Sequence, residues 1–189
     1  FGALLAFVLS PQQAMEWRRI EGLPELDAAA YAATGIGEEV ALTGTLTDNA
    51  AQVSEELVAY VREQWEIEPA NRTDDSTSND EPEGSWNTVE TVVPALTIAI
   101  NGGNIKTISV GSATLGGNMR ETAIQQGRGS EKADYNGQQL PEGSTRMRGF
   151  ANGDVVTIVG HKASTGDVTP ERIFGGDRVQ LIENIRSGA

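Results

Sequence analysis

Residues 96–110 read LTIAINGGNIKTISV, in which two runs of alternating apolar and polar residues flank Asn101-Gly102-Gly103. Alternation with a period of two is typical of a strand that has one buried face. An Asn-Gly pair between two such runs favours a tight hairpin turn, because both residue types tolerate the positive φ angles that the turn requires. The segment therefore predicts a β-hairpin with strands over residues 96–100 and 105–110.

The same alternation recurs on both sides of this hairpin and predicts a β-rich domain over residues 36–185. Further strands are expected at residues 40–46, 57–67, 88–93, 146–150 and 155–159, followed by two apolar segments that contain Ile173, Phe174, Val179 and Leu181. Residues 116–143 are loosely patterned and glycine-rich, so we expect an excursion outside the core. The pattern predicts a mostly β fold, either an OB-like barrel or a small β-sandwich, between which local alternation does not discriminate.

The net charge of −13 is concentrated in one part of the chain. Residues 54–90 contain eleven acidic and two basic residues, a net charge of −9, whereas residues 91–189 carry +1. An acidic field repels phosphate backbones, so we expect no nucleic acid partner. Residues 71–85 have no periodicity and predict a mobile acidic hairpin loop. Their acids lack the Asp-x-Asp-x-Asp-Gly order of a calcium loop, so no metal site is expected there.

An uncharged apolar run, residues 1–9, leads to Trp17, Arg18 and Arg19. Such a Trp-Arg-Arg cluster is typical of the place where a membrane segment meets the lipid headgroups. Nine residues at about 1.5 Å each span less than half of a hydrocarbon core of roughly 30 Å. We therefore expect residues 1–19 to be the C-terminal part of a membrane-anchor helix and its interface, with a buried N-terminal helix of a soluble domain as the alternative. Residues 20–35 predict a linker helix.

The sequence contains few candidate catalytic residues. The chain has no Cys and one His, His161, and it contains no Gly-x-Ser-x-Gly motif. A Ser triad needs a His within reach of both a Ser and an acid, and His161 is the single candidate. No phosphate-binding glycine motif is present either. The sequence therefore predicts neither a catalytic residue nor a cofactor.

Two sets of side chains are candidates for contacts with partners. Trp65 and Trp86 flank the acidic loop and can face each other across a hairpin, where they would form either a core pair or, if exposed, a partner-binding platform. The C-terminal half is locally basic, and its arginines would either be solvated or seat an acidic partner or lipid headgroups; they are Arg146, Arg148, Arg172 and Arg178.

The chain contains, in order, GEEVALTGTLTDN (37–49), LVAYVREQWE (57–66), GSWNTVETVVPALTI (84–98) and GFANGDVVTIVGHKASTGD (149–167). This order, over residues 36–182, resembles the GIDE domain, also called the beside-a-membrane domain, of membrane-anchored ubiquitin ligases and their prokaryotic relatives. The resemblance implies a domain between two transmembrane helices, outside the compartment that holds any catalytic RING. A RING needs Cys and His ligands that this chain lacks, so we expect no ubiquitin ligase activity.

Together these features predict a non-enzymatic, membrane-anchored β-domain that acts as an accessory or scaffold subunit of a membrane assembly. Its expected partners are the lipid bilayer and integral membrane proteins. The resemblance favours an extracytoplasmic domain, although Arg18 and Arg19 beside the anchor would favour the cytoplasmic side. The alternatives are a cell-envelope hydrolase, which would need acidic side chains converging on His161, and a self-assembling envelope filament or surface protein, which would need exposed edge strands.

Overall fold

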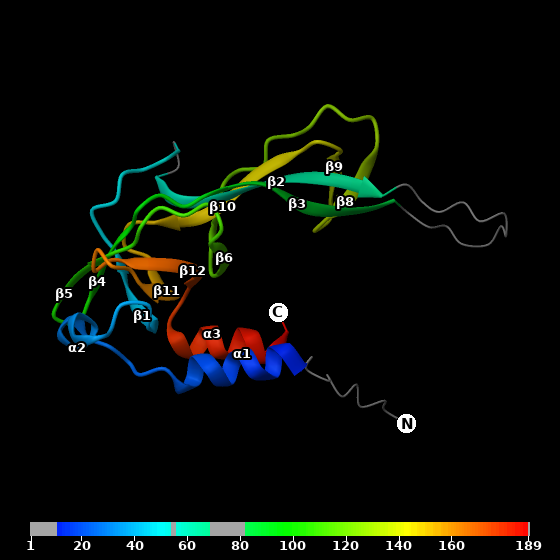
Figure 1. The fold of residues 1–189 in the computed structure, drawn as a ribbon. Coiled ribbons are helices and arrows are strands. Elements are labelled where there is room, and N and C mark those ends of the chain that lie inside the picture. Colours follow the sequence, from blue (N-terminus) through cyan, green and yellow to red (C-terminus); the bar gives the residue numbers. More distant parts are fainter. Residues whose placement is uncertain (1–10, 54–55, 69–81, 189) are drawn as a thin grey trace, which may run out of the picture.

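A computed structural model of the chain describes residues 11–53, 56–68 and 82–188. The expectation of a mostly β fold is confirmed, since the described residues form twelve strands and three helices (Figure 1). The apolar run over residues 1–9 and most of the expected acidic loop lie outside the described residues. Within them, no helix combines the length and the apolar character that crossing a bilayer requires.

A six-stranded sheet forms the larger part of the domain. Its strands lie in the order β5 (Gly103–Lys106), β4 (Thr97–Ile100), β1 (Glu39–Leu46), β11 (Val155–Lys162), β12 (Val168–Gly175) and β6 (Thr114–Gly117). The predicted hairpin is confirmed: Ile100 pairs with Gly103, and Gly102 adopts a φ of 87° in the turn. Its second strand ends at Lys106 rather than residue 110, because the chain then turns toward β12, where Ile108 N donates to Val168 O at 2.8 Å.

A four-stranded sheet, in the order β3 (Glu83–Val92), β2 (Leu57–Glu68), β10 (Thr145–Ala151) and β7 (Arg120–Glu121), extends away from the first (Figure 1). We call the outer part of its β2–β3 hairpin, residues 63–68 and 83–88, the arm. The pairing of Glu68 with Glu83 confirms a hairpin across the acidic segment, but residues 83–85 belong to β3 and not to the loop.

A third, two-stranded sheet lies against the arm and corrects the expectation for residues 116–143. It consists of β8 (Lys132–Tyr135) and β9 (Gln138–Pro141), which place Ala133 and Leu140 in a buried cluster with Trp65. The same region also contains β7 and the end of β6. These strands have four residues or fewer, too few to show a period of two, so the sequence pattern did not reveal them.

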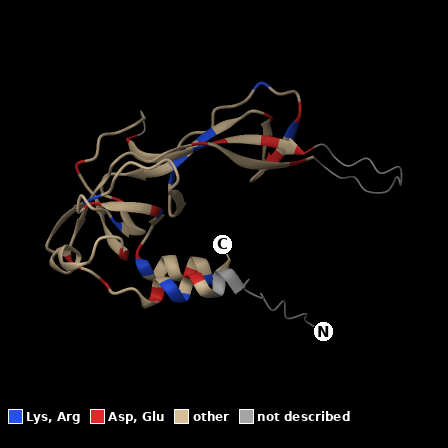
Figure 2. Ribbon diagram, viewed as in Figure 1, with Lys and Arg blue, Asp and Glu red and all other residues tan. Residues whose placement is uncertain are grey.

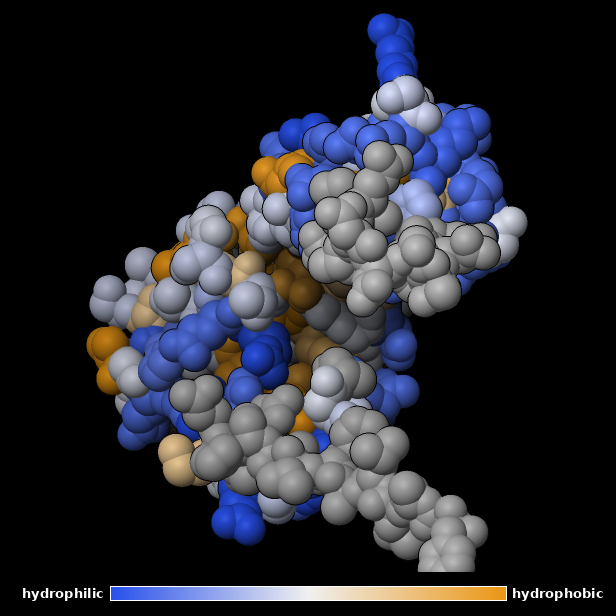
Figure 3. Space-filling view, turned by 90° about the vertical axis from the view of Figure 1, so that its right-hand side faces the viewer, coloured by the Kyte–Doolittle hydropathy of each residue, from blue (hydrophilic) through white to orange (hydrophobic). Residues whose placement is uncertain are grey.

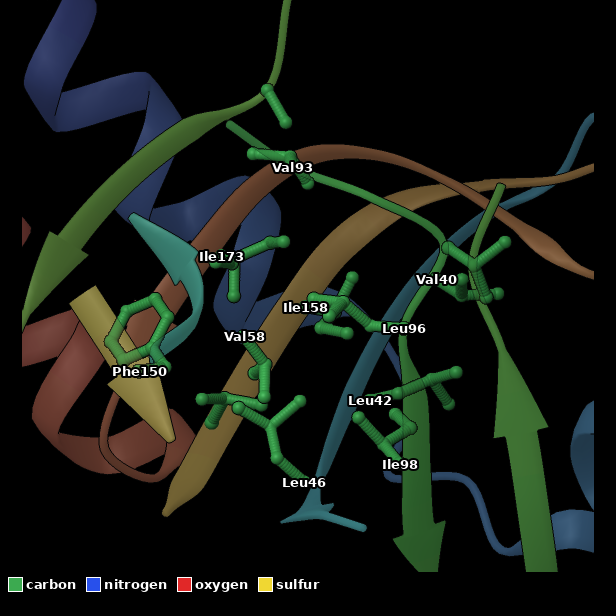
Figure 4. Packing of buried hydrophobic residues seen from close by; sticks show 14 of the residues in the cluster. Val40, Leu42, Leu46, Val58, Val93, Leu96, Ile98, Phe150, Ile158 and Ile173 are labelled. Atoms are coloured by element: carbon green, nitrogen blue, oxygen red, sulfur yellow. The ribbon is translucent and has the colours of Figure 1, made fainter. Parts of the chain in front are cut away.

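One core joins the two larger sheets. Leu42, Ile158 and Ile173 of the first sheet pack with Val58 and Phe150 of the second, and all five are fully buried (Figure 4). Because both sheets contribute one face to this cluster, the strands form separate layers over a shared interior, the arrangement of a two-sheet packing.

Helices α1 (Pro11–Gly22) and α3 (Arg178–Ser187) pack against each other and on the outer face of the six-stranded sheet. Of the two final apolar segments, the one with Ile173 and Phe174 belongs to β12, whereas the one with Val179 and Leu181 is not a further β segment but lies in α3. Asp177 caps that helix in a capping box with Gln180, and Leu181 and Ile185 are buried at helical spacing.

The expected linker helix over residues 20–35 is interrupted. Helix α1 ends at Gly22, and α2 (Ala28–Ala33) begins after the cap Asp27, whose side chain accepts from Ala30 N at 2.8 Å. Pro24 separates the two helices, because proline disfavours helical conformation in the residue before it and donates no backbone hydrogen bond. Ile20 is 1% exposed beneath α3, so α1 is part of the folded domain.

The two helices α1 and α3 are antiparallel (Figure 1), and acidic and basic residues lie along both of them (Figure 2). Arg186 of α3 pairs with Glu21 of α1 at 3.1 Å, and Arg172 of β12 pairs with Glu16 of α1 at 2.8 Å. Arg178, at the start of α3, donates from Nη2 to the carbonyl oxygens of Ile20, Glu21 and Leu23 at 2.6, 2.8 and 2.5 Å. A cation at this position satisfies carbonyl groups that have no partner within the helix. One side chain of α3 therefore binds three carbonyl oxygens at the end of α1.

We expect Arg178→Met to lower the free energy of opening of α1 by about 1.5–3 kcal/mol, because three carbonyls lose a charged donor. Native-state hydrogen exchange at the α1 amides measures this quantity. Arg128→Met is the control, since Arg128 is exposed and has no ion pair among the described residues. Unchanged protection of α1 in Arg178→Met would contradict the capping role.

Candidate functional site

A groove lies between the four-stranded sheet, strand β6 and helix α3. Its main compartment has a volume of about 740 Å³, and Leu115, Met119 and Phe174 contribute apolar surface to it. The strand wall includes Val61, Thr88 and Arg148, and the helix wall is polar, with Gln180, Glu183, Asn184 and Ser187. Figure 3 shows this face of the molecule hollowed between two hydrophilic rims, with apolar residues inside the hollow.

A second compartment of about 300 Å³ continues the first, because Leu115, Gly116, Phe174 and Asn184 line both. It extends to Glu16 in α1 and Gly188 after α3. We refer to the two compartments together as the groove. The groove therefore follows β6 and reaches the end of the helix pair at which α1 begins and α3 ends.

The position of β6 and its two glycines explain why the groove is open. β6 is the last strand of its sheet and pairs in parallel with β12, with Gly116 opposite Phe174. Gly117 has a φ of 77°, and a side chain there would meet the Phe174 ring. A Cβ on Gly116 would meet no atom within 4 Å, so the backbone of β6 is uncovered on the groove side.

An arginine network stiffens the strand wall of the groove. Arg146 Nε donates to Glu63 Oε2 at 2.6 Å, and its Nη1 donates to Tyr135 Oη at 2.6 Å and to Glu121 Oε2 at 3.0 Å. The guanidinium also lies 4.3 Å from the Trp86 ring centroid. Arg146 is 7% exposed and Glu63 is 8% exposed, so both charges are held inside the protein.

The environment of Arg146 keeps it charged despite its burial. Burial by itself lowers the pKa of the Arg146 guanidinium, but the hydrogen bond and charge of Glu63, with the charge of Glu121, raise it above its ordinary value overall. Arg148 lies next to this network, with Nη1 3.7 Å from Glu63 Oε1, and lines the groove. Buried charges that are paired and hydrogen-bonded in this way specify one arrangement of the strands.

Trp65 and Trp86 lie directly opposite each other on β2 and β3, with ring centroids 5.1 Å apart. Trp65 is 2% exposed and packs with Ala133 and Leu140, so its ring offers no surface to a partner. Trp86 is half-buried and meets the Tyr135 ring edge-on at 5.6 Å. The two side chains pack the arm together, and neither lines the groove.

The three residues expected at a membrane interface have contacts within the domain. Trp17 is half-buried in the helix pair, and the Arg186 guanidinium lies 4.2 Å from its ring centroid. Arg19 pairs with Glu39 at 3.0 Å, and the guanidinium of the exposed Arg18 lies 5.2 Å from the Trp17 ring centroid. The contacts of Trp17 and Arg19 attach the second half of α1 to the domain.

The four arginines of the C-terminal half are also engaged in intramolecular contacts. Arg146 is buried, Arg178 caps α1, and Arg172 pairs with Glu16 at 2.8 Å. Arg148 alone among them lines the main compartment of the groove. The structure therefore does not bring them together as one basic patch.

The one histidine of the sequence lies apart from the groove. His161 is part of β11, where its Nδ1 is 3.2 Å from Glu171 Oε1; Glu171 is exposed and His161 is half-buried. In the described part of the chain, no three His, Asp or Glu side chains are grouped closely enough to hold a metal ion. The surfaces that the groove offers are apolar, amide and charged groups, which suit the binding of a chain or ligand.

Sequence reasoning missed β6 and the Glu63–Arg146 pair. A signal for the pair was present, because alternation along β2 places Glu63 on the same face as Val61, Trp65 and Ile67, and a carboxylate on an apolar face needs a buried partner. No comparable signal marks β6, whose four residues include two glycines. Comparison with protein-family models, curated proteins and solved structures gives no match to this chain.

Proposed function

We propose that this protein is a non-catalytic accessory or scaffold subunit of a membrane assembly. In this proposal the segment before α1 attaches the protein to the bilayer, and the β-domain binds an integral membrane partner through the groove. Attachment raises the local concentration of the domain near its partner, so a groove of modest affinity is sufficient.

One observation carries the proposal: the groove opens where the chain enters the domain. Because α1 and α3 are antiparallel, the start of α1 and the end of α3 lie at the same end of the molecule (Figure 1). Gly188, at that end, lines the second compartment of the groove, together with Glu16 in the middle of α1. A bilayer attached through residues 1–9 would thus lie beside the mouth of the groove.

The resemblance to the GIDE domain supports the same arrangement, since it implies a domain held beside a membrane. It also favours an extracytoplasmic position, which is part of the proposal. Trp17 packs in the helix pair and Arg19 pairs with Glu39 of β1, so the apolar run is the proposed membrane-inserting part.

The alternative of a self-assembling filament has one observation in its favour. β3 is a ten-residue edge strand with exposed residues, and edge strands can pair between copies. Against this, the ladder is irregular between Arg62 and Glu63, and β3 carries Glu83 and Glu90 with no basic residue. Bulges and charges of this kind oppose pairing between identical strands.

The proposal is tested by isolating the protein from its native membrane in mild detergent. We expect it to sediment with membranes and to be isolated with a constant set of integral membrane proteins at fixed stoichiometry. Recovery of the protein in the soluble fraction, or from membranes without a partner, would overturn the proposal. Long, regular polymers of the purified protein would favour the filament instead.

A further inference from the structure

We propose that the groove binds an extended segment of a partner polypeptide, which adds as a further strand to the open edge of β6. The inference rests on the proposed function, which supplies the kind of partner, an integral membrane protein. It adds how that partner is recognised. Strand addition supplies affinity through main-chain hydrogen bonds, while side-chain positions along the added strand supply specificity.

The first argument is the hydrogen bonding of β6. Asn118 N donates to Gly175 O of β12 at 2.8 Å. Along a parallel strand, every second residue directs its backbone N–H and C=O toward the same neighbouring strand. Gly116 therefore directs its N–H and C=O toward β12, and Leu115 directs its own away from β12. Among the described residues no strand pairs with this second edge of β6, and no backbone partner is present for Leu115. A strand edge without partners that faces an open groove favours pairing with another chain.

The second argument is the space along this edge. The main compartment of about 740 Å³ and its continuation of about 300 Å³ share Leu115 and Gly116, so the open volume extends along the strand. Gly116 presents no side chain to the groove, and a Cβ there would have no neighbour within 4 Å. A second backbone can therefore approach β6 closely, which is a recurrent use of glycine in strands.

The third argument concerns the two walls, which differ in chemistry. Side chains of an added strand would alternate between the four-stranded sheet and α3, because successive residues of a strand point to opposite sides. Toward the sheet they would meet the apolar side chains of Val61 and Met119 and, beside them, the polar side chains of Thr88 and Arg148. Toward α3 they would meet Asn184 and Glu183, and Glu183 is exposed without an ion pair in the described part of the chain. The segment therefore alternates apolar residues with polar ones, including a basic residue opposite Glu183.

The same charge argues against a second copy of this chain as the occupant. β3 is the longest edge strand that another copy could offer, and its charged residues are Glu83 and Glu90. Either glutamate would repel Glu183 across the groove. A partner segment with a basic residue has the complementary charge.

The test uses Gly116→Trp, which fills the groove, and Gly111→Trp as its matched control. Both glycines have open space at the Cβ position and neither has a positive φ, so both variants are expected to fold, as thermal unfolding would verify. Gly111 does not line the groove. The probe is a library of random peptides displayed on phage, selected against the wild-type protein. We expect selected peptides to alternate apolar with polar or basic residues, to bind Gly111→Trp, and to lose detectable binding to Gly116→Trp.

A second measurement tests the strand pairing without any change to the protein. N-methylation of a selected peptide at alternate amides removes main-chain donors, and we expect affinity to fall about two- to tenfold for each amide that pairs with β6. Methylation at the intervening amides should have little effect. Equal tolerance at every amide would overturn strand addition.

Three further outcomes would overturn the inference. In the first, the library yields no binding peptide. In the second, the selected peptides bind Gly116→Trp as well as they bind the wild-type protein. In the third, the wild-type protein is a dimer that Gly116→Trp dissociates, which would identify a second copy as the occupant. The proposed function and this inference can fail independently. If peptides bind the groove as expected but no membrane partner is isolated with the protein, the proposed function is wrong and the inference is not. If Gly116→Trp is isolated with the membrane partners at full stoichiometry, the inference is wrong and the proposed function is not.

Discussion

Replacing Arg146 with Met is expected to lower the free energy of unfolding by about 3–5 kcal/mol, because the variant leaves the Glu63 carboxylate buried without its partner. Glu63 is 8% exposed, and its Oε2 lies 2.6 Å from Arg146 Nε. Arg148 is too far to replace that bond, since its Nη1 lies 3.7 Å from Glu63 Oε1. Urea unfolding followed by tryptophan fluorescence measures the loss, because Trp65 and Trp86 lie in the same arm.

Two control variants separate an unpaired charge from lost packing. The double variant Arg146→Met with Glu63→Leu removes both buried charges, and we expect it to recover most of the stability that the single variant loses. Arg62→Met breaks an exposed pair with Glu90 on the same hairpin and should cost about 0–1 kcal/mol. A double variant as unstable as Arg146→Met would show that the guanidinium acts through its contacts with Tyr135 and Trp86 and not by neutralising Glu63.

Phe150→Ala is expected to destabilise the protein by about 3–5 kcal/mol, because the ring is fully buried where the two larger sheets meet. The truncation removes apolar contacts and leaves a cavity that the surrounding strands fill only in part. A Cβ on Gly175 of β12 would lie 2.7 Å from the Phe150 ring, which shows how closely β10 and β12 approach there. Loss of the ring should therefore weaken the contact between the sheets.

Equilibrium urea unfolding measures this loss, with Val155→Ala as the control. Val155 is 47% exposed at the start of β11, so its truncation should change the free energy of unfolding by about 0.5 kcal/mol or less. Equal effects of the two variants would contradict a shared core between the sheets. An unfolding curve with two separate transitions in Phe150→Ala would indicate that the sheets unfold independently once the ring is removed.

Strand positions could be read from the sequence wherever the alternating pattern was long. The pattern over residues 40–46, 57–67 and 96–100 matches β1, β2 and β4 within one residue at every boundary. Each of these strands has one face on the core, and a period of two reports that burial directly. The hairpin turn at Asn101-Gly102 was predictable for a similar local reason, since few residue types accept its backbone angles.

Local patterns failed where a segment depends on distant neighbours. Val179 and Leu181 alternate as a strand would, yet they lie in α3, because Asp177 and Gln180 cap a helix whose buried residues are Leu181 and Ile185. Two apolar residues at a spacing of two do not discriminate between strand and helix. The sheet beneath, which accepts Leu181, Ile185 and Ile20 in one cluster, favours the helix.

The amino-acid sequence alone was sufficient to predict a mostly β domain and an acidic region beside a pair of tryptophans. It was also sufficient to predict two hairpins, one connected through residues 69–82 and the other through residues 101–102. These features depend on residues close together in the chain, so local periodicity and charge report them. The tertiary structure alone decided three further features. They are the face of the tryptophan pair that is covered, the carboxylate that Arg146 neutralises, and the place where a groove opens. The groove illustrates the reason. Its walls come from β2, β6, β10 and α3, which are far apart in the sequence, and Gly116 leaves the backbone of β6 uncovered where these segments meet.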